Sequence, residues 1–406
     1  MSETKTAPRA LPDGRTPDVV RAFSKTIDAD PALLHARLRR ECPVALQDGS
    51  GGTSNGLQDG WLITRYEDIL AVSRDTDTFG QSIRWPSRRR PPLESNPPEH
   101  RQFRALMQPF FMPAALAPLE PVSRRIAVEL LEPLLAAGSG DFAHAVARPL
   151  PPQVLLARMG QPLEDWPRIK ASCEAAYLQG SKDPKDIATF EEANEYLWSY
   201  SHAAVADRKA VPRDPKQDII AALLAGEIDG APVDEDLIAG MVRLVLAAGH
   251  DSTTSAIGIC VGYLAENPQV QEQLRQDRSL IGTAIEEILR LRAPVIQMPR
   301  VVRKDTELGG RHLLEGDRLL MVFASGNHDE TAFEDVETCV LDRMPNRHLS
   351  FGVGVHVCIG NGLARQEMRV TLDELLTRTT AFGLEREPQR EFWHPYGATA
   401  LPLWFK

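Results

Sequence analysis

The chain has 406 residues, which is ample for a large buried core. Its 46 basic and 56 acidic residues give a net charge of −10, which favours solubility and gives no support to a nucleic-acid-binding role. The cysteines are scattered and odd in number, a usage that suits a reducing cytoplasm better than a disulfide framework: Cys42, Cys173, Cys260, Cys339 and Cys358. We therefore expect a cytoplasmic protein.

Neither a membrane span nor a secretory signal is indicated. No stretch reaches the roughly 18 to 20 uninterrupted apolar residues that a span requires. Residues 1–17 are polar, contain prolines and lack the apolar core of a signal sequence. We expect these residues to form a short disordered lead and the protein to make no membrane contact.

The first hundred residues predict a small mixed region. Pro31–Glu41 has leucines at helical spacing, Gly60–Thr64 is typical of a strand, and Glu67–Ser73 of a helix. Regular patterning then stops in Phe79–Pro98, where prolines and arginines cluster. A solvated loop is the favoured interpretation, and the alternative is a mobile lid whose arginines meet an anionic substrate or a partner. The arginines concerned are Arg84, Arg88, Arg89 and Arg90.

Most of the remaining chain has helical periodicity. Surface helices are predicted in Pro113–Ala137, Pro152–Met159, Leu163–Leu178 and Ala188–Arg208. The longest pattern, Asp234–Asn267, would form a helix of about 50 Å at 1.5 Å per residue, enough to cross a whole domain.

The C-terminal third mixes strands with one more helix. Arg290–Val322 alternates apolar and polar residues in pieces divided by glycines, which indicates strands and turns. Asn361–Thr377 predicts a helix, and Phe382–Lys406 predicts short strands. The fold class expected is mainly α with small β-sheets.

The stretch Phe351–Gly360, with sequence F-G-V-G-V-H-V-C-I-G, places one cysteine among glycines ahead of a helical pattern. Several roles are possible for Cys358, and a buried structural cysteine is the commonest role for a lone cysteine. A zinc site with His348 and His356 is poorly supported, because no further ligand pair accompanies it. A phosphate-binding loop is also poorly supported, because Val357 stands where the third glycine of that motif belongs.

As a whole, this ten-residue pattern resembles the haem-binding loop of the cytochromes P-450, F-G-x-G-x-H-x-C-x-G, with every fixed position filled. The resemblance implies that the cofactor is haem b and that Cys358 is the axial thiolate ligand of its iron. It also implies haem contacts for Phe351, Gly352, His356 and Gly360.

Two other positions match propionate-binding residues of that family. His100 and Arg104 are four apart on one predicted helix face, and such a pair is most often a solvated polar face. The string P-P-E-H-x-x-x-R resembles the family helix that holds a haem propionate. Arg300 matches a further propionate-binding arginine.

The middle of the longest helical pattern interrupts an apolar run with small and polar residues. Ala248 and Gly249 could serve simple helix packing, with the following hydroxyls bonding back to the previous turn. The stretch also resembles the family's A-G-x-D/E-T-T signature, which implies a haem contact at these two residues and catalytic roles for Asp251, Ser252 and Thr253. Serine stands where the first threonine is usual, so the implied proton relay through Ser252 is expected to be functional but less firmly placed.

A fourth motif is structural. Glu287 and Arg290 are three apart and share a helix face, which alone is weak evidence because exposed pairs contribute at most about 1 kcal/mol. Their order in the chain resembles the family's E-x-x-R pair, and Arg343 matches the third member of that network.

The resemblance implies one cytochrome P-450 domain over residues 18–406, with a long central helix over the haem and a four-helix core. It implies an O₂-dependent monooxygenase that inserts one oxygen atom into a small organic substrate, with electrons from NAD(P)H through ferredoxin reductase and ferredoxin. Residues expected to line the substrate pocket are Val245, Ala248, Val295, Ile296 and Tyr396. Residues expected to face the ferredoxin are Arg101, Arg104, Arg347 and Arg365.

Other outcomes on the same fold stay open. One is a haem enzyme that is driven by peroxide or that ends in desaturation, coupling or nitration. Another is a haem-thiolate sensor that does not turn over. The sequence does not name the substrate.

Overall fold

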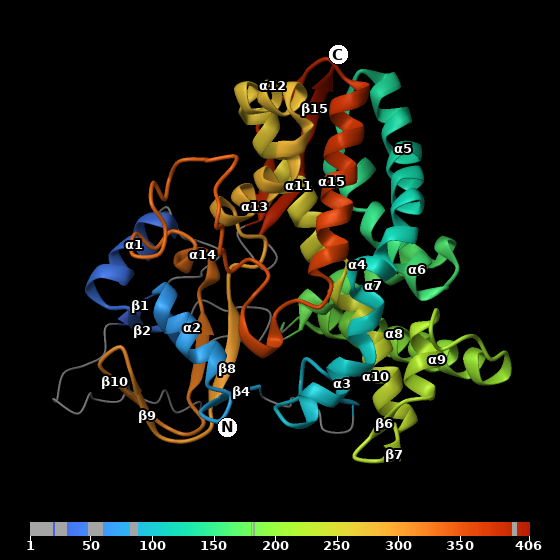
Figure 1. The fold of residues 1–406 in the computed structure, drawn as a ribbon, viewed down its shortest axis with the longest axis vertical. Helices are drawn as coiled ribbons and strands as arrows, with labels where there is room; N and C mark the ends of the chain where they lie inside the picture. The colour runs from blue at the N-terminus through green and yellow to red at the C-terminus, as the bar shows by residue number, and fades with distance from the viewer. Residues whose placement is uncertain are drawn as a thin grey trace.

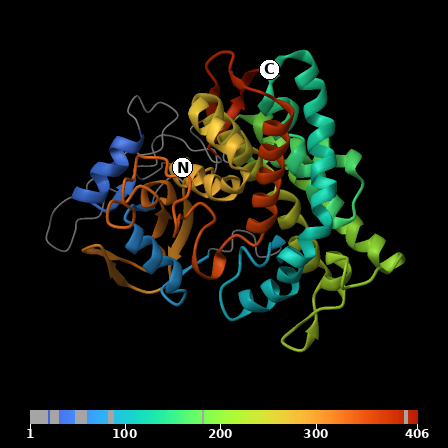
Figure 2. The same cartoon turned by 45° about the horizontal axis from the view of Figure 1, so that its top comes forward.

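The computed structural model describes residues 19–20, 31–47, 60–81, 88–179, 181, 183–391 and 396–406. The predicted N-terminal lead, and Arg84 within the arginine-rich stretch, lie outside these residues. A large helical part stands beside a smaller part that contains the main sheet, and both views show this division (Figures 1 and 2). The mainly helical class with small sheets is therefore confirmed.

The centre of the helical part is α15 (Asn361–Arg378), which packs against α5 (Glu120–Ala137), α11 (Asp251–Glu266) and α13 (Ile281–Leu291). The α11 helix is apolar on nearly every face, so it is stable only when surrounded by other elements. Its residues and those of α15 belong to one continuous apolar core. This core is the rigid frame on which the functional loops rest.

Further helices surround this frame. Those that precede α11 are α3 (Glu99–Met107), α4 (Pro113–Leu116), α6 (Leu150–Met159), α7 (Trp166–Ala175), α8 (Pro184–Ala210), α9 (Ile219–Leu224) and α10 (Glu235–Ala248). The others are α1 (Pro31–Glu41) and α2 (Tyr66–Arg74) beside the main sheet, and α12 (Pro268–Gln276) and α14 (Phe323–Gly326) later in the chain.

The main sheet has six strands in the order β1-β2-β3-β11-β8-β4. Their bounds are β1 (Val19–Val20), β2 (Val44–Gln47), β3 (Gly60–Ile63), β4 (Phe79–Gly80), β8 (Met298–Val302) and β11 (Arg318–Met321). The central pair β3 and β11 is parallel, with Leu62 opposite Leu320. The sheet therefore joins the first part of the chain to the segment that carries Arg300.

The remaining strands form small sheets. The strand β5 (Ser139–Asp141) pairs with β15 (Pro402–Phe405), which also pairs with β12 (Phe382–Leu384). The two-stranded sheets are β6 (Glu227–Ile228) with β7 (Ala231–Pro232), β9 (Thr306–Leu308) with β10 (Arg311–Leu313), and β13 (Gln389–Glu391) with β14 (Gly397–Ala400).

The expected uninterrupted helix over Asp234–Asn267 is wrong at its middle. The helix α10 ends at Ala248 and α11 begins at Asp251, with a turn at Gly249 and His250. A Cβ atom at Gly249 would lie 3.0 Å from Cδ2 of Leu155, so the break brings α6 unusually close to the backbone. The predicted A-G-x-D/E-T-T signature is thus divided between the helices: Ala248 ends α10, and Asp251, Ser252 and Thr253 begin α11.

The stretch Glu235–Glu266, which spans both helices, has the length and composition of a membrane span. Of its most apolar window, 61% is buried inside the protein, and a core helix of a soluble protein has the same composition. The stretch is therefore weak evidence for a membrane.

Candidate functional site

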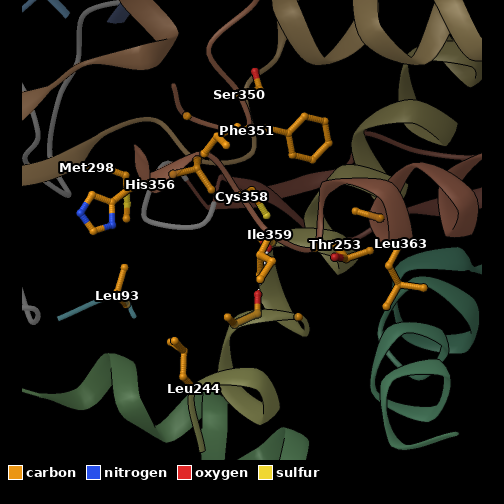
Figure 3. Close-up of a pocket in the computed structure, with 18 of the residues that line it drawn as sticks. Leu93, Leu244, Thr253, Met298, Ser350, Phe351, His356, Cys358, Ile359 and Leu363 are labelled. Atoms are coloured by element: carbon orange, nitrogen blue, oxygen red, sulfur yellow. Dashed lines mark hydrogen bonds between the residues drawn. The ribbon is translucent and has the colours of Figure 1, made fainter. Parts of the chain in front are cut away.

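A cavity of about 380 Å³ lies between α10 and α11 on one side and the 350–360 loop on the other. In the close-up, Cys358 and Ile359 lie near its centre and Leu93 and Leu244 lie across from Phe351 (Figure 3). Most of its wall is apolar. The apolar lining residues include Leu93, Leu155, Leu244, Val245, Ala247, Ala248, Val295, Met298, Phe351 and Leu363.

The loop that presents Cys358 is built on glycines with left-handed backbone. Gly352 has φ of 69° and Gly354 has φ of 76°, a region that glycine enters freely. A Cβ atom at Gly354 would stand 2.4 Å from the backbone oxygen of Ser73, so no other residue fits. The Cys358 N–H donates to the Phe351 carbonyl at 2.8 Å, which closes the loop.

Cys358 is exposed and lines the cavity. Burial raises the pKa of the Cys358 thiol, against the opposing effects of the Gly360 N–H, Arg104 and Arg365. A metal ion at the sulfur would reverse the net effect, because a coordinating thiol is deprotonated outright. The loop thus offers one thiolate ligand beside an apolar space.

A group of nitrogen-bearing side chains borders the same cavity: His100, Arg104, Arg300 and His356. The rings of His100 and His356 are 4.2 Å apart between centroids. Burial, with the nearby arginines, lowers the pKa of His100 to about 4 and that of His356 to about 3.

Neither ring nitrogen of His100 has a hydrogen-bond partner among the described residues, although the side chain is only 1% exposed. Arg300 is 6% exposed, and burial lowers its pKa to about 10. Arg104 donates only to neutral groups, including the Val357 carbonyl at 2.8 Å. Within the described chain this group has no acidic partner, so it is prepared for an anion from elsewhere.

Asp251, at the start of α11, lines the cavity and forms a buried ion pair. Its Oδ1 accepts a hydrogen bond from Nζ of Lys170, which is 1% exposed. Lys170 also donates to Thr254 Oγ1 at 3.3 Å. Burial, together with the charge of Asp251 and a hydrogen bond to it, raises the pKa of Tyr177, another residue of the cavity wall.

This ion pair continues towards the surface. Lys170 Nζ lies 3.8 Å from Oε1 of Glu174, which is 37% exposed. Glu174 in turn accepts two hydrogen bonds from Arg148, at 2.8 and 2.5 Å. A chain of charged groups therefore connects the cavity wall with solvent.

The two hydroxyl residues after Asp251 both line the cavity. Ser252 Oγ donates to the Ala248 carbonyl at 3.3 Å, back across the break between the helices. Thr253 is buried, and Figure 3 shows it on the side of Leu363. The signature residues Ala248, Gly249, Asp251, Ser252 and Thr253 are thus gathered on one wall, opposite the cysteine loop.

The predicted Glu287, Arg290 and Arg343 form a network beneath this site. The carboxylate of Glu287 accepts two hydrogen bonds from Arg290, at 2.9 and 2.8 Å, and Arg343 Nε lies 3.0 Å from both of its oxygens. Glu287 and Arg290 are both fully buried. Although burial raises the pKa of Glu287, its hydrogen bonds with Arg290 and Val340 bring the pKa below the ordinary value.

The predicted substrate-pocket residues are only partly gathered. Val245, Ala248 and Val295 line the cavity. Ile296 does not, because it packs on a separate apolar cluster beside the main sheet. Tyr396 lines a different small cavity next to α11, and its N–H donates to the Pro294 carbonyl.

Two wall residues, Tyr177 and Glu367, were missed from the sequence, as was Lys170, which contacts Asp251 but does not line the cavity. Glu367 lies on α15, is 2% exposed and has no partner for Oε2 among the described residues. Burial raises its pKa well above the ordinary value. A charged residue on an otherwise apolar helix face was the only signal that could have pointed to Lys170 or Glu367.

Comparison with known proteins identifies the family of this chain. The family model described as Cytochrome P450 matches residues 183–399. "Cytochrome P450 109" of Bacillus spizizenii is 33% identical over 86% of this chain and 84% of its own length, and "Linalool 8-monooxygenase" of Pseudomonas putida is 29% identical over 93% and 95%. The crystal structure of CYP109E1 from Bacillus megaterium in complex with corticosterone has a TM-score of 0.80, with 28% identity over 92% of this chain and 98% of that one. The chain therefore belongs to the cytochrome P450 family and is a haem monooxygenase.

Proposed function

We propose that Cys358 ligates the iron of haem b in the described cavity, and that the enzyme oxidises a small, largely apolar organic substrate there. One observation carries the proposal. A thiol accessible from an apolar cavity lies beside a group of buried cations and imidazoles that has no acidic partner in the described chain. Haem b has the matching parts: an iron for the thiolate, an apolar ring and two carboxylates.

The residues of this chain fit such a cofactor. His100, Arg104, Arg300 and His356 would hold the carboxylates, because guanidinium groups suit carboxylates and an unpaired buried nitrogen is costly. Phe351, Gly352 and Gly360 would lie beside the ring near the sulfur, and Ala248 and Gly249 offer small side chains on the opposite wall. When bound, haem with a thiolate ligand supplies an iron centre that favours cleavage of the O–O bond.

Proton supply is assigned to the wall formed by residues 251–253. Asp251 is connected to solvent through Lys170 and Glu174, and a carboxylate within reach of a hydroxyl can organise the water that passes protons. Ser252 is assigned as the relay and Thr253 as the reserve. Because the Ser252 hydroxyl is engaged with the Ala248 carbonyl, it must leave that bond to serve as the relay.

The apolar wall supports a substrate with a large apolar part. The names of the relatives mention linalool, and the related crystal structure contains corticosterone, so both are compatible with such a pocket. The atom that is oxidised would lie beside Val245, Ala248 and Val295, on the wall opposite Cys358.

We assign electron delivery to a ferredoxin in the cytoplasm. A reductase would reduce this ferredoxin with electrons from NAD(P)H. Of the four arginines expected to face it, Arg101 and Arg347 have exposed side chains. Arg104 is bonded to the cysteine loop and Arg365 to Glu286, so these two are already engaged. Arg101 and Arg347 are therefore the preferred docking residues.

The test is the spectrum of the reduced carbon monoxide complex of the purified protein. The parent should show the band that names the family, and Cys358→Ser should lose it. Cys339→Ser, which changes a cysteine that does not line the cavity, should keep the band. Product formation from O₂ with NADPH, a ferredoxin and its reductase completes the test, and an unchanged band in Cys358→Ser would overturn the ligand assignment.

A further inference from the structure

Tyr177 is a residue of the cavity wall that contacts the carboxylate of Asp251. It lies in the 3₁₀ turn Ala176–Leu178, which continues the helix α7. Tyr177 and Asp251 both line the cavity, and the Tyr177 hydroxyl donates a hydrogen bond to the carboxylate. Asp251 therefore has a neutral partner in the wall in addition to its charged partner, Lys170.

The charged partner lies on the other side of the carboxylate. Lys170 bonds to Oδ1 of Asp251 but does not line the cavity, and its Nζ lies 3.8 Å from Glu174, on the way to solvent. Acting alone, Lys170 would draw the carboxylate away from the cavity. The Tyr177 hydroxyl opposes this pull because it belongs to the wall. The carboxylate is thus held between a solvent-side partner and a cavity-side partner.

One helix presents both partners. Lys170 and Tyr177 are seven residues apart, which is about two helical turns, so they lie on the same side of α7 and its continuation. Cys173 lies between them, and its Sγ donates to the Leu246 carbonyl of α10 at 3.8 Å. This contact fixes the same side of α7 against α10, next to the first turn of α11. Helix packing therefore sets the position of the phenol.

The hydroxyl assigned as the relay makes no such contact with Asp251. Ser252 Oγ donates to the Ala248 carbonyl at 3.3 Å, and within the described residues no hydrogen bond joins Ser252 to Asp251. Water must bridge these two groups for a proton to pass between them. The position of the carboxylate on the cavity side decides whether a water molecule can do so, and Tyr177 contacts that carboxylate.

The phenol is suited to hold the carboxylate without taking part in the proton transfer. Burial raises the pKa of the Tyr177 hydroxyl, and the charge of Asp251 and the hydrogen bond to it act in the same direction. The hydroxyl therefore keeps its proton at neutral pH. It donates one hydrogen bond to the carboxylate and leaves the negative charge in place.

We propose that Tyr177 is a positioning residue for the proton supply: its hydroxyl holds the carboxylate of Asp251 at the cavity wall, where water can connect it to Ser252. This inference rests on the proposed function and adds a residue of the α7 region to the wall at 251–253. Without the hydroxyl, the carboxylate turns to Lys170 alone, and protons reach the cavity more slowly.

Tyr177→Phe removes the hydroxyl and keeps the ring in the wall. NADPH oxidation by the haem-loaded enzyme is measured in H₂O and in D₂O, with saturating ferredoxin, its reductase and linalool as the probe. Tyr177→Phe should slow NADPH oxidation roughly tenfold and increase its solvent isotope effect. The matched control is Tyr200→Phe, which removes a hydroxyl that donates to Asp165 at 2.8 Å and does not line the cavity. It should change neither quantity.

The Asp251→Asn variant distinguishes positioning from simple packing of the wall. Because Tyr177 acts through Asp251, Tyr177→Phe should add no further slowing when Asp251→Asn is already present. A structural role of the ring or hydroxyl would slow NADPH oxidation by the same factor in both backgrounds. That result, or parent-like NADPH oxidation in Tyr177→Phe, would overturn the proposal.

Urea unfolding tests the contact independently of turnover. Tyr177→Phe should lower the free energy of unfolding less in Asp251→Asn than in the parent, because the bond to an ionised carboxylate is already lost there. Additive losses would contradict the contact. If the carbon monoxide band is present and Asp251→Asn slows NADPH oxidation, the proposed function stands whatever Tyr177→Phe does. If Asp251→Asn has no effect, the assignment of proton supply to this wall fails as well.

Discussion

Lys170 and Asp251 form a buried ion pair at the cavity wall, joining α7 to the first turn of α11. Removing one partner of a buried pair leaves an uncompensated charge, which typically costs about 3–5 kcal/mol. We predict that Lys170→Met lowers the free energy of unfolding by about this amount, as measured by urea denaturation. Lys170→Met combined with Asp251→Asn should recover part of the loss, and additive effects of the two changes would contradict direct pairing.

The hydroxyl of Ser252 is predicted to control how reducing equivalents are used. Ser252→Ala should still bind haem and substrate but should divert NADPH to hydrogen peroxide, because the relay group is gone. Ser252→Thr should form at least as much product per NADPH as the parent, since the added methyl restricts χ1. Product per NADPH is the measurement. If Ser252→Ala is as tightly coupled as the parent, Thr253 or ordered water takes the role.

Glu287 holds the segment ahead of the cysteine loop. It accepts hydrogen bonds from Arg290, Arg343 and the Asn346 amide, the last at 2.9 Å. We predict that Glu287→Gln lowers the free energy of unfolding by about 3–5 kcal/mol and reduces the haem content of the purified protein. Glu129→Gln, in a pair whose carboxylate is 58% exposed, should change stability by less than about 1 kcal/mol. Equal effects of the two changes would refute a structural role for the network.

Glu286 should contribute to stability in a pH-dependent way. Although burial raises its pKa, hydrogen bonds from Arg365 and His348 lower it to about 2. A carboxylate with a depressed pKa stabilises the fold above its unfolded value of about 4.5, and this contribution is lost as the pH falls towards 2. Glu286→Gln should cost about 1–3 kcal/mol at pH 6, since Arg365 is 39% exposed and solvent screens part of the interaction. The difference in free energy of unfolding between Glu286→Gln and the parent should shrink at pH 3. A difference that stays constant from pH 6 to pH 3 would contradict a depressed pKa of Glu286.

Ferredoxin docking is predicted to depend on Arg101. A local basic patch can act within a Debye length of roughly 8 to 10 Å in spite of the net charge of −10. Arg101→Glu should slow reduction by ferredoxin and weaken its dependence on ionic strength, as measured by stopped-flow absorbance. The matched control is Arg125→Glu on α5, at an arginine that is 53% exposed. Reduction rates independent of salt in the parent would contradict this docking surface.

Motifs with fixed spacing could be read from the sequence, because local geometry determines them. The pair Glu287 and Arg290 is one helical turn apart, so its members had to share a face. The glycines around Cys358 likewise indicated a tight loop, and two of them have positive φ. The family resemblance then supplied the order of these motifs.

Contacts between distant helices could not be read in this way. Nothing in the sequence pairs Lys170 with Asp251, since the contact depends on how α7 packs beside α11. The break at Gly249 coincides with a close approach of Leu155, which periodicity does not report. The short helix Ile219–Leu224 was missed although Asp218 caps it by accepting from the Ala221 N–H, a signal that the sequence did contain.

The parallel pairing of β3 with β11 has a consequence for biosynthesis. Every residue of β3 is buried in the finished protein, yet β11 leaves the ribosome some tens of seconds after β3, at ~5–20 residues per second. During that interval β3 can pair with β2, which precedes it in the chain, but its other edge has no partner. Residues 60–63 are therefore a natural binding segment for a chaperone that holds chains during translation.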